Sequence, residues 1–268
     1  MSDPAVLEWL LDSDPAIRWQ VERDILHARP ARWQATRARV ETEGWGARLL
    51  SLRDENGIWA GVAFWPKDFS QAAYEAEGQA WTATSHCLTL LRQMGLDPAS
   101  ATSRTLRDQV GRIALWEKGD QPFWQGETEE CINGRTLSDG VYFGADVSGI
   151  AARLITERQA DGRWNCDRCR GTLRSSFANT INVLEGRSAF EQATGITPAL
   201  RAALEAGQDY LLTRQIFRRA SNGAVVDPDV LVLYHPWRWH YDILRALEYI
   251  RTSGVSKDRR LQEAADLL

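Results

Sequence analysis

Apolar residues recur every three or four positions along most of the chain, which is the spacing of amphipathic helices. One apolar stripe begins at Val6 and a second begins at Ile17. Asp14-Pro15 is typical of an N-cap followed by the first residue of a helix, so it marks the start of the second helix. The sequence predicts that this helix ends at Arg29-Pro30 and that a third helix covers Trp33–Glu43.

After residue 43 a larger pattern recurs with an irregular period of roughly 50–60 residues. Each unit has a helix, a loop that is often rich in Gly and Trp, and a second, more apolar helix. The expected pairs are Trp45–Leu52 with Gln79–Met94, Thr102–Trp116 with Cys131–Phe143, Val147–Gln159 with Ser175–Ala193, and Ala199–Arg214 with Trp239–Arg251. A last helix is expected over Arg259–Leu268.

The two helices of a pair differ in polarity. The first carries charge, as Arg153 and Glu157 show in the third pair, whereas the second is apolar over more of its circumference. An outer helix keeps one face in water and an inner helix keeps much less. The pattern therefore predicts an all-α fold: an α/α toroid, meaning a complete or partial double-layered ring of helical hairpins. We expect residues 1–43 to form an N-terminal helical extension packed on the ring and residues 44–268 to form the toroid domain.

One loop of this pattern resembles a known family. In the stretch from Leu154 to Trp164, Gln159 precedes Gly162-Arg163-Trp164, which is similar to the repeat of squalene/hopene cyclases; Gly57-Ile58-Trp59 is a shorter second copy. The resemblance spans roughly residues 45–268. It implies the α/α toroid that terpenoid cyclases share with the β-subunits of protein prenyltransferases. A Trp at such a loop can cover the end of a helix pair while its N–H finds an acceptor.

Composition narrows the class of protein. The chain has 268 residues, a net charge of −4 and 25% charged residues, a balance typical of globular proteins rather than disordered ones. Its mild acidity argues against nucleic-acid binding. No run approaches about 18 apolar residues, so no transmembrane insertion is expected. With no signal peptide pattern and 4 Cys, we expect a cytoplasmic protein with reduced thiols.

The motifs of triterpene cyclases are missing although the fold resemblance is present. The chain has no D-x-D-D acid motif, and Asp227-Pro228-Asp229 lacks the third carboxylate. It also has no D-D-x-x-D, P-loop, dinucleotide fingerprint, G-x-S-x-G or H-E-x-x-H motif. The cyclase activity therefore does not follow from the resemblance, because one fold serves many functions.

Cysteine and histidine instead fall where inner helices begin. Cys131 opens the second pair's inner element, Cys166 and Cys169 lie in the loop before the third inner helix, and His240 lies in the first turn of the fourth. Inner helices of a ring run the same way, so these residues converge at one end. Thiolates and imidazole are preferred zinc ligands. All four together form a closed structural site, whereas Cys131, Cys166 and His240 alone leave an open catalytic position.

The prenyltransferase β-subunits also hold a zinc at an inner-helix end, through Asp, Cys and His. Trp239-His240-Tyr241 resembles their His-bearing helix start. The other two ligands do not carry over, because Arg174-Ser175-Ser176 stands where that family's pair is expected. The resemblance thus implies a zinc role for His240 alone.

Further candidates complete the expected site. His86, Asp139 and Tyr142 are candidate proton-handling residues, and Trp81, Arg174 and Trp239 are candidate substrate-binding residues at inner-helix starts. The leading hypothesis is a zinc-dependent transferase, lyase or hydrolase that acts on a small, partly apolar or isoprenoid-like molecule in the central cavity. The alternatives are a metal-independent terpenoid cyclase or other isoprenoid-processing enzyme, in which Trp faces stabilise cations, and a non-catalytic module that binds a lipid-like ligand or a partner.

Overall fold

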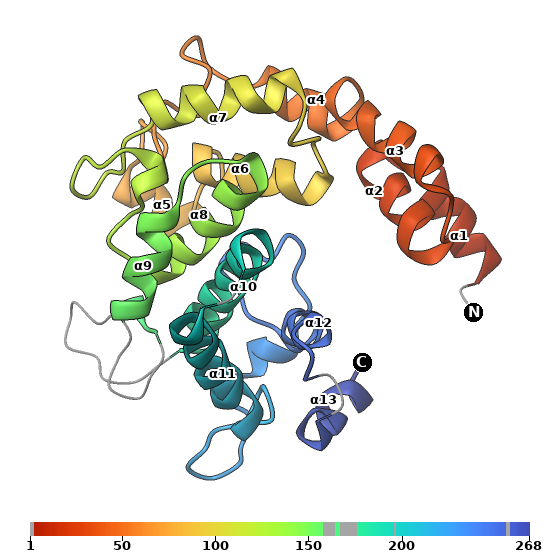
Figure 1. Cartoon of the computed structure of the whole chain (residues 1–268), viewed down its shortest axis with the longest axis vertical. Helices are drawn as coiled ribbons and strands as arrows, with labels where there is room; N and C mark the ends of the chain where they lie inside the picture. The colour runs from red at the N-terminus through yellow and green to blue at the C-terminus, as the bar shows by residue number, and fades with distance from the viewer. Residues whose placement is uncertain (1–2, 158–163, 167–175, 196, 256–257) are drawn as a thin grey trace. The chain divides into compact units, whose positions relative to one another are not determined.

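The structure is a computed structural model that describes residues 3–157, 164–166, 176–195, 197–255 and 258–268. Every regular secondary-structure element in these ranges is a helix, which confirms the all-α class (Figure 1). The only strand-like pairings there are two isolated bridges, Leu115 with Pro122 and Arg218 with Val225. None of the helices in the described ranges combines the length and apolarity needed to cross a membrane.

The chain divides into two compact units. Unit 1 is Met1–Phe123 with Tyr142–Ala145, and unit 2 is Trp124–Val141 with Asp146–Leu268. The helices of unit 1 are α1 (Pro4–Leu11), α2 (Pro15–Gln20), α3 (Pro30–Ala38), α4 (Gly44–Ser51), α5 (Gln71–Glu77), α6 (Thr84–Met94) and α7 (Ala101–Ile113). Those of unit 2 are α9 (Ser148–Thr156), α10 (Phe177–Thr194), α11 (Pro198–Thr213), α12 (Ile243–Thr252) and α13 (Gln262–Asp266). Helix α8 (Glu130–Phe143) lies mostly in unit 2.

The N-terminal helices begin where their caps predict. The Asp14 side chain accepts the Ala16 N–H at 2.8 Å and Pro15 is the first residue of α2, as the sequence predicted. Helix α2 continues as a π-helix over Val21–Ile25. The third helix starts at Pro30 rather than at Trp33, because Pro suits the first helical turn, where its missing N–H costs nothing.

Residues 1–43 pack on the C-terminal end of α6 inside unit 1. The Trp19 indole donates to the Met94 carbonyl at 2.8 Å, and Arg37 Nε donates to the Gly95 carbonyl at 2.8 Å. Gly95 ends α6 with φ +89°, and a Cβ there would lie 2.5 Å from the Trp19 ring. Glycine therefore serves both the left-handed cap and the close approach of the indole.

The Gly/Trp loops join helix pairs in the same way in both units. The Trp59 indole donates to the Leu49 carbonyl of α4 at 2.9 Å, and the Trp164 indole donates to the Leu154 carbonyl of α9 at 2.9 Å. Each Trp lies ten residues after its acceptor, and both rings are buried. The Trp carbonyls accept from the start of the next helix, at Thr84 and Ser176. These residues seal helix pairs, as their spacing predicted.

Burial alternates between paired helices. Helix α4 buries two of its eight residues and α6 buries seven of eleven, so the second helix is the more enclosed. Helix α7 likewise buries only three of thirteen. The fourth pair differs less, since α11 buries seven of sixteen residues and α12 five of ten. The alternation predicted from polarity is thus clear in the first pair and weak in the last.

Helices α8 and α10 approach each other closely in unit 2. A Cβ at Gly186 would lie 2.1 Å from the Gly134 carbonyl oxygen, and a Cβ at Gly134 would lie 2.4 Å from the Asn182 carbonyl oxygen. Both positions therefore require glycine for steric reasons. This contact fixes α8, which carries Cys131 in its first turn, against α10.

A buried arginine ties α12 to α10. Arg245 donates to Glu185 through Nε at 2.9 Å and through Nη2 at 2.6 Å, and to Asn182 Oδ1 at 2.9 Å. Its Nη1 donates to the His240 carbonyl at 2.6 Å. Burying a guanidinium is tolerable only with such complete pairing. The Arg245 network therefore fixes the segment that carries His240.

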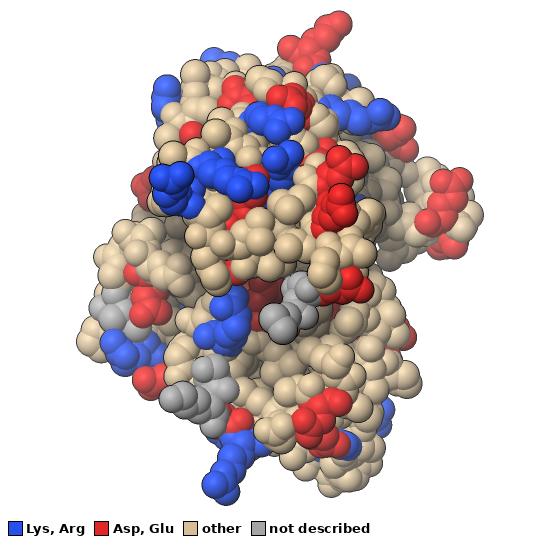
Figure 2. Space-filling view, turned by 90° about the vertical axis from the view of Figure 1, so that its right-hand side faces the viewer, with Lys and Arg blue, Asp and Glu red and all other residues tan. Residues whose placement is uncertain are grey.

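The surface carries both signs of charge. On the face drawn in Figure 2, basic and acidic side chains are interspersed. This agrees with the small net charge of −4.

Candidate metal centre and neighbouring pocket

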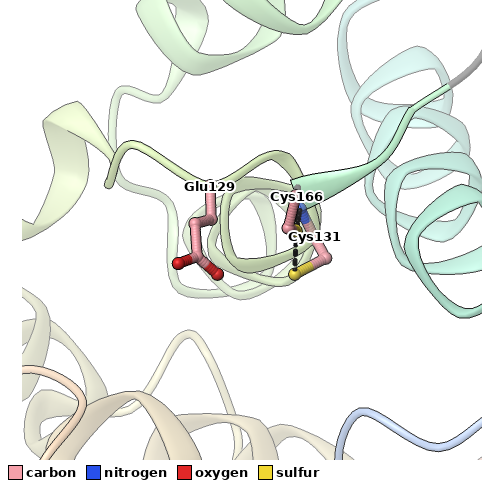
Figure 3. A group of neighbouring side chains, drawn as sticks. All are labelled: Glu129, Cys131 and Cys166. Carbon is pink, nitrogen blue, oxygen red and sulfur yellow. Dashed lines mark hydrogen bonds between the residues drawn. The ribbon is translucent and has the colours of Figure 1, made fainter. Parts of the chain in front are cut away.

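Cys131 and Cys166, which are 35 residues apart in the sequence, meet in unit 2. Their sulfur atoms lie 2.7 Å apart, and no disulfide is formed by either cysteine within the described residues. Glu129 joins them, so that one carboxylate oxygen and two sulfur atoms all lie within 4.8 Å of one another (Figure 3). All three side chains are partly exposed, which leaves the group accessible from solvent.

A clamp at the start of α8 places Glu129. Asn133 is fully buried; its Oδ1 accepts the Glu127 N–H at 2.7 Å and its Nδ2 donates to the Glu127 carbonyl at 2.7 Å. Gly126 has φ +87°, and a Cβ there would lie 2.5 Å from Asn133 Oδ1. Glu127 in turn accepts the Glu129 N–H at 2.5 Å. The loop is thus held from both sides just before Cys131.

The start of α10 places Cys166. The Ser176 N–H donates to the Trp164 carbonyl at 3.3 Å, and Asn179 Nδ2 donates to Asn165 Oδ1 at 3.2 Å. Because Trp164 is itself anchored to α9, the three residues 164–166 are held between two helices. Cys166 is therefore fixed beside α8 by the same Trp loop that seals the helix pair.

A hydrogen bond joins the two thiols. The hydrogen bond from Cys166 to Cys131, together with burial, raises the pKa of the Cys166 thiol well above its ordinary value. Cys131 lies in the first turn of α8, and its N–H donates to Cys166 Sγ at 3.4 Å. Because a metal ion binds the thiolate form, uptake of a divalent cation would displace thiol protons.

The donor set fits zinc. Zinc accepts thiolate sulfur and carboxylate oxygen in four-coordinate sites, and three protein ligands leave one position for water or a substrate atom. Two sulfurs and one carboxylate oxygen within 4.8 Å of one another can converge on a single ion after small side-chain adjustments. The group can thus hold a metal ion.

The other two predicted ligands are placed differently. Cys169 lies outside the described residues. His240 is not part of the Glu129–Cys131–Cys166 group; it lines a cavity of about 590 Å³ in unit 2 together with Trp239. The His240 ring stacks between Tyr234, at 4.2 Å, and Trp239, at 4.1 Å. Burial lowers the pKa of His240 against the opposing effect of Asp229 and Asp242.

The predicted proton-handling residues are divided between the two units. His86 is buried on α6 of unit 1, with Phe64 at 4.7 Å and the predicted substrate-binding Trp81 at 4.8 Å, both edge-on. Tyr142, also in unit 1, donates to the Leu96 carbonyl at 2.6 Å and accepts from Arg37 at 2.9 Å, and burial raises its pKa. Asp139 is buried on the unit 2 part of α8. Arg174 lies outside the described residues.

Sequence reasoning missed Glu129. The signal was the run Glu127-Thr128-Glu129-Glu130 directly before Cys131, which places a carboxylate two residues from a predicted thiolate ligand at a helix start. Three of these four residues are acidic, and the sequence alone does not indicate which carboxylate lies beside the thiols. The structure distinguishes them, since Glu127 caps the loop whereas Glu129 faces the sulfurs.

Comparison with known proteins adds no relative. No protein-family model, no curated protein and no solved structure gives a significant match to this chain.

Proposed function

We propose that this protein is a zinc-dependent enzyme whose metal centre is formed by Glu129, Cys131 and Cys166. The observation that carries the proposal is the convergence of these three ligand atoms within 4.8 Å from two distant segments. Three protein ligands with an open fourth position are the arrangement of catalytic zinc sites, in which the ion polarises a bound group or activates water. The reaction class is a transfer, lysis or hydrolysis step on a small molecule.

The cavity lined by Trp239 and His240 supports an enzyme rather than a purely structural metal site. Ser176, the N-cap of α10, lines this cavity, and its N–H donates to the carbonyl of Trp164, two residues before Cys166. The start of α10 therefore contributes to the cavity and also holds the segment that carries Cys166. We propose that the substrate, a small and partly apolar molecule, binds in this cavity.

We also propose that the helix pairs belong to an α/α toroid similar to that of squalene/hopene cyclases and prenyltransferase β-subunits. The support is the repeated Trp geometry: Trp59 and Trp164 each bind a carbonyl ten residues earlier and each carbonyl accepts from the next helix. Such equivalence is expected of repeats that share one architecture. No cyclase activity is part of this proposal, because the acid motif is absent from the sequence.

Cobalt substitution tests whether the centre is open. Co²⁺ bound by two thiolates gives charge-transfer and ligand-field absorption, so titration of the apo-protein reports the ligand set directly. We expect one Co²⁺ per chain, loss of the sulfur bands in Cys131→Ser and Cys166→Ser, and unchanged spectra in the control Cys87→Ser, whose thiol lies on α6 and donates to the Thr82 carbonyl.

Added cyanide then distinguishes a catalytic from a structural site. A shift of the ligand-field bands on adding cyanide shows an exchangeable fourth position, and the same shift in Cys169→Ser shows that Cys169 is not a ligand. If cyanide leaves the spectrum of the parent protein unchanged but shifts that of Cys169→Ser, Cys169 occupies the fourth position. The centre is then closed and structural, which contradicts the proposed enzyme. Absence of sulfur bands in the parent protein contradicts the centre itself.

A further inference from the structure

Three aromatic residues that pack against one another, Phe177, Tyr210 and Tyr241, line the cavity in unit 2, and we call them its floor. Phe177, the first residue of α10, lies 5.3 Å from the Tyr210 ring and 5.1 Å from the Tyr241 ring. All three are buried, and Tyr241 donates its hydroxyl to the Ile216 carbonyl at 2.5 Å. Because each ring is packed against another, the floor is rigid and offers apolar surface to a ligand.

A second set of rings forms a stack at the wall of the same cavity. Tyr234, His240 and Trp239 lie nearly parallel, with interplanar angles of 8° and 25° between neighbours. Trp239 ends this stack and is 51% exposed although it lines the cavity. An exposed, pre-oriented indole at the end of a stack is suited to receive one more planar ring.

Arginines provide the polar part of the cavity. Arg218 is neutralised by Glu263, to which it donates two hydrogen bonds. Arg214 lies over the Tyr210 ring at 4.0 Å and donates to the Tyr210 carbonyl and the Thr213 hydroxyl. Arg219 donates to the Val226 carbonyl. In the described part of the chain neither Arg214 nor Arg219 has an ion pair, so both keep their charge for a ligand.

The cavity lining also includes the start of helix α10 and two carboxylates. Helix α10 has eighteen residues and begins at the cavity with Phe177, so its first N–H groups, which have no acceptor within the helix, lie at this wall. The lining also holds two carboxylates: Asp227 accepts the Asp229 N–H at 3.0 Å to cap a turn, and the charge of Asp229 opposes the lowering of the His240 pKa by burial. The positive groups available to a ligand are Arg214 and Arg219.

We infer that this cavity binds a small planar aromatic anion, that is, an aromatic or heteroaromatic ring that carries a carboxylate or phosphate group. The ring lies against Trp239 and the Phe177 floor, and the acid group meets Arg214 and Arg219. The volume of about 590 Å³ is in the range of small-molecule sites. That this ligand is the substrate rests on the proposed function, whereas its binding does not require the metal.

Calorimetric titration with matched probes tests the inference. The probes are 1-naphthoate for a carboxylate source and AMP for a phosphate source; 1-naphthalenemethanol keeps the naphthyl ring without the charge, and acetate and inorganic phosphate keep the charge without the ring. We expect at least one aromatic anion to bind one per chain with a Kd below about 1 mM. Its uncharged or ring-free counterparts should bind about tenfold more weakly or not at all, since each lacks one of the two contacts.

Two pairs of variants locate the site. Arg214→Gln and Trp239→Ala should each weaken binding about tenfold or more, the loss expected for one charge-assisted hydrogen bond or one stacked ring. The controls are Arg201→Gln, an exposed arginine of α11 outside the cavity, and Trp45→Ala, whose side chain is also 51% exposed. Circular dichroism confirms that each variant is folded.

Ligand binding in the cavity can be measured separately from metal binding by Glu129, Cys131 and Cys166. Binding that persists in Cys131→Ser while the metal is lost supports the cavity independently of the zinc centre. The inference is overturned if neither anion binds saturably, if 1-naphthalenemethanol binds as tightly as 1-naphthoate and phosphate as tightly as AMP, or if the control variants weaken binding as much as Arg214→Gln and Trp239→Ala do.

Discussion

At the scale of single residues, Asn133 supports the candidate metal centre without being one of its ligands. Its side-chain amide makes two hydrogen bonds to the backbone of Glu127, and the carbonyl of Glu127 also accepts from Arg153 at 3.0 Å. These bonds hold the loop that presents Glu129 beside the thiols. Groups that orient ligands in this way often change metal affinity by 10–100-fold.

We therefore predict that Asn133→Ala lowers the affinity for zinc by about 10–100-fold while one ion per chain still binds at saturation. Competition with a coloured chelator measures the affinity, and cobalt absorption reports whether the two sulfur ligands remain. Asn179→Ala, which removes the hydrogen bond to Asn165 on the other side of the site, should act in the same direction. An affinity equal to that of the parent protein would show that the clamp does not position Glu129.

At the residue scale, the sequence predicted the pair of thiols but neither the carboxylate beside them nor the surroundings of His240. Cys131 and Cys166 were singled out as thiols at helix starts, and they do meet. Glu129 was missed because nothing in the sequence separates it from Glu127 and Glu130. His240 was expected to join the thiols, but the structure places it between two aromatic rings in the cavity. Its neighbours come from the long loop 215–241, whose path the helical periodicity does not determine.

At the scale of helices, the α8–α10 contact depends on two glycines. The Gly186 position has no room for a Cβ, because the Gly134 carbonyl oxygen would lie 2.1 Å away. Neither glycine has a positive φ, so the constraint is steric rather than conformational. A methyl group would force the two backbones apart.

Accordingly, Gly186→Ala should lower the free energy of unfolding by about 1–3 kcal/mol through overpacking. Gly149→Ala is the matched control, because Gly149 is also helical and has no neighbour within 4 Å of a built Cβ. That substitution should be neutral or stabilise the protein by up to about 1 kcal/mol. Urea unfolding followed by circular dichroism measures both, and equal effects of the two substitutions would argue against a close helix contact.

A second helix-scale feature is a buried carboxylate in the N-terminal helices. Glu22 is fully buried in the π-helical turn after α2. Burial alone raises the pKa of Glu22, but hydrogen bonds from Thr36, Arg18 and Arg32 outweigh it and hold the pKa below its ordinary value. Ionised Glu22 therefore stabilises the packing of α2 on α3.

Because the pKa of Glu22 is lower in the folded than in the unfolded state, its contribution is complete at neutral pH and is lost as the pH falls below about 4. Glu22→Gln should lower the free energy of unfolding by about 1–3 kcal/mol at pH 7, and the difference from the parent protein should shrink in acid. Glu8→Gln, on an exposed position of α1, should show no such change with pH. A difference for Glu22→Gln that does not vary with pH would contradict this account.

Helix positions were largely predictable from the sequence, whereas their ends were less so. Apolar spacing and caps predicted α7, α8, α10 and α11 to within about three residues. The start of α6 was placed at Gln79 instead of Thr84, because the residues in between continue the apolar pattern although Trp81 and Thr82 form a turn. Helix α5 was not predicted; its segment is short and none of its residues is buried, so it leaves no periodic signal.

At the scale of the whole molecule, the excess of tryptophan marks repeated structure. The chain has 12 Trp, and Trp59, Trp116 and Trp164 are buried with their indole N–H groups bound to carbonyls. The two units each contain one Trp loop of the same geometry, which explains the irregular repeat seen in the sequence.

Metal binding by Glu129, Cys131 and Cys166 is the central claim about this molecule. Native mass spectrometry with elemental analysis of the protein, purified under reducing conditions and supplied with zinc, measures this directly. We predict one zinc per chain in the parent protein and in Cys87→Ser, and loss of zinc in Cys131→Ser and Cys166→Ser. Zinc bound equally by all four proteins, no zinc in any, or a Cys131–Cys166 disulfide in the reduced preparation would contradict the proposed centre.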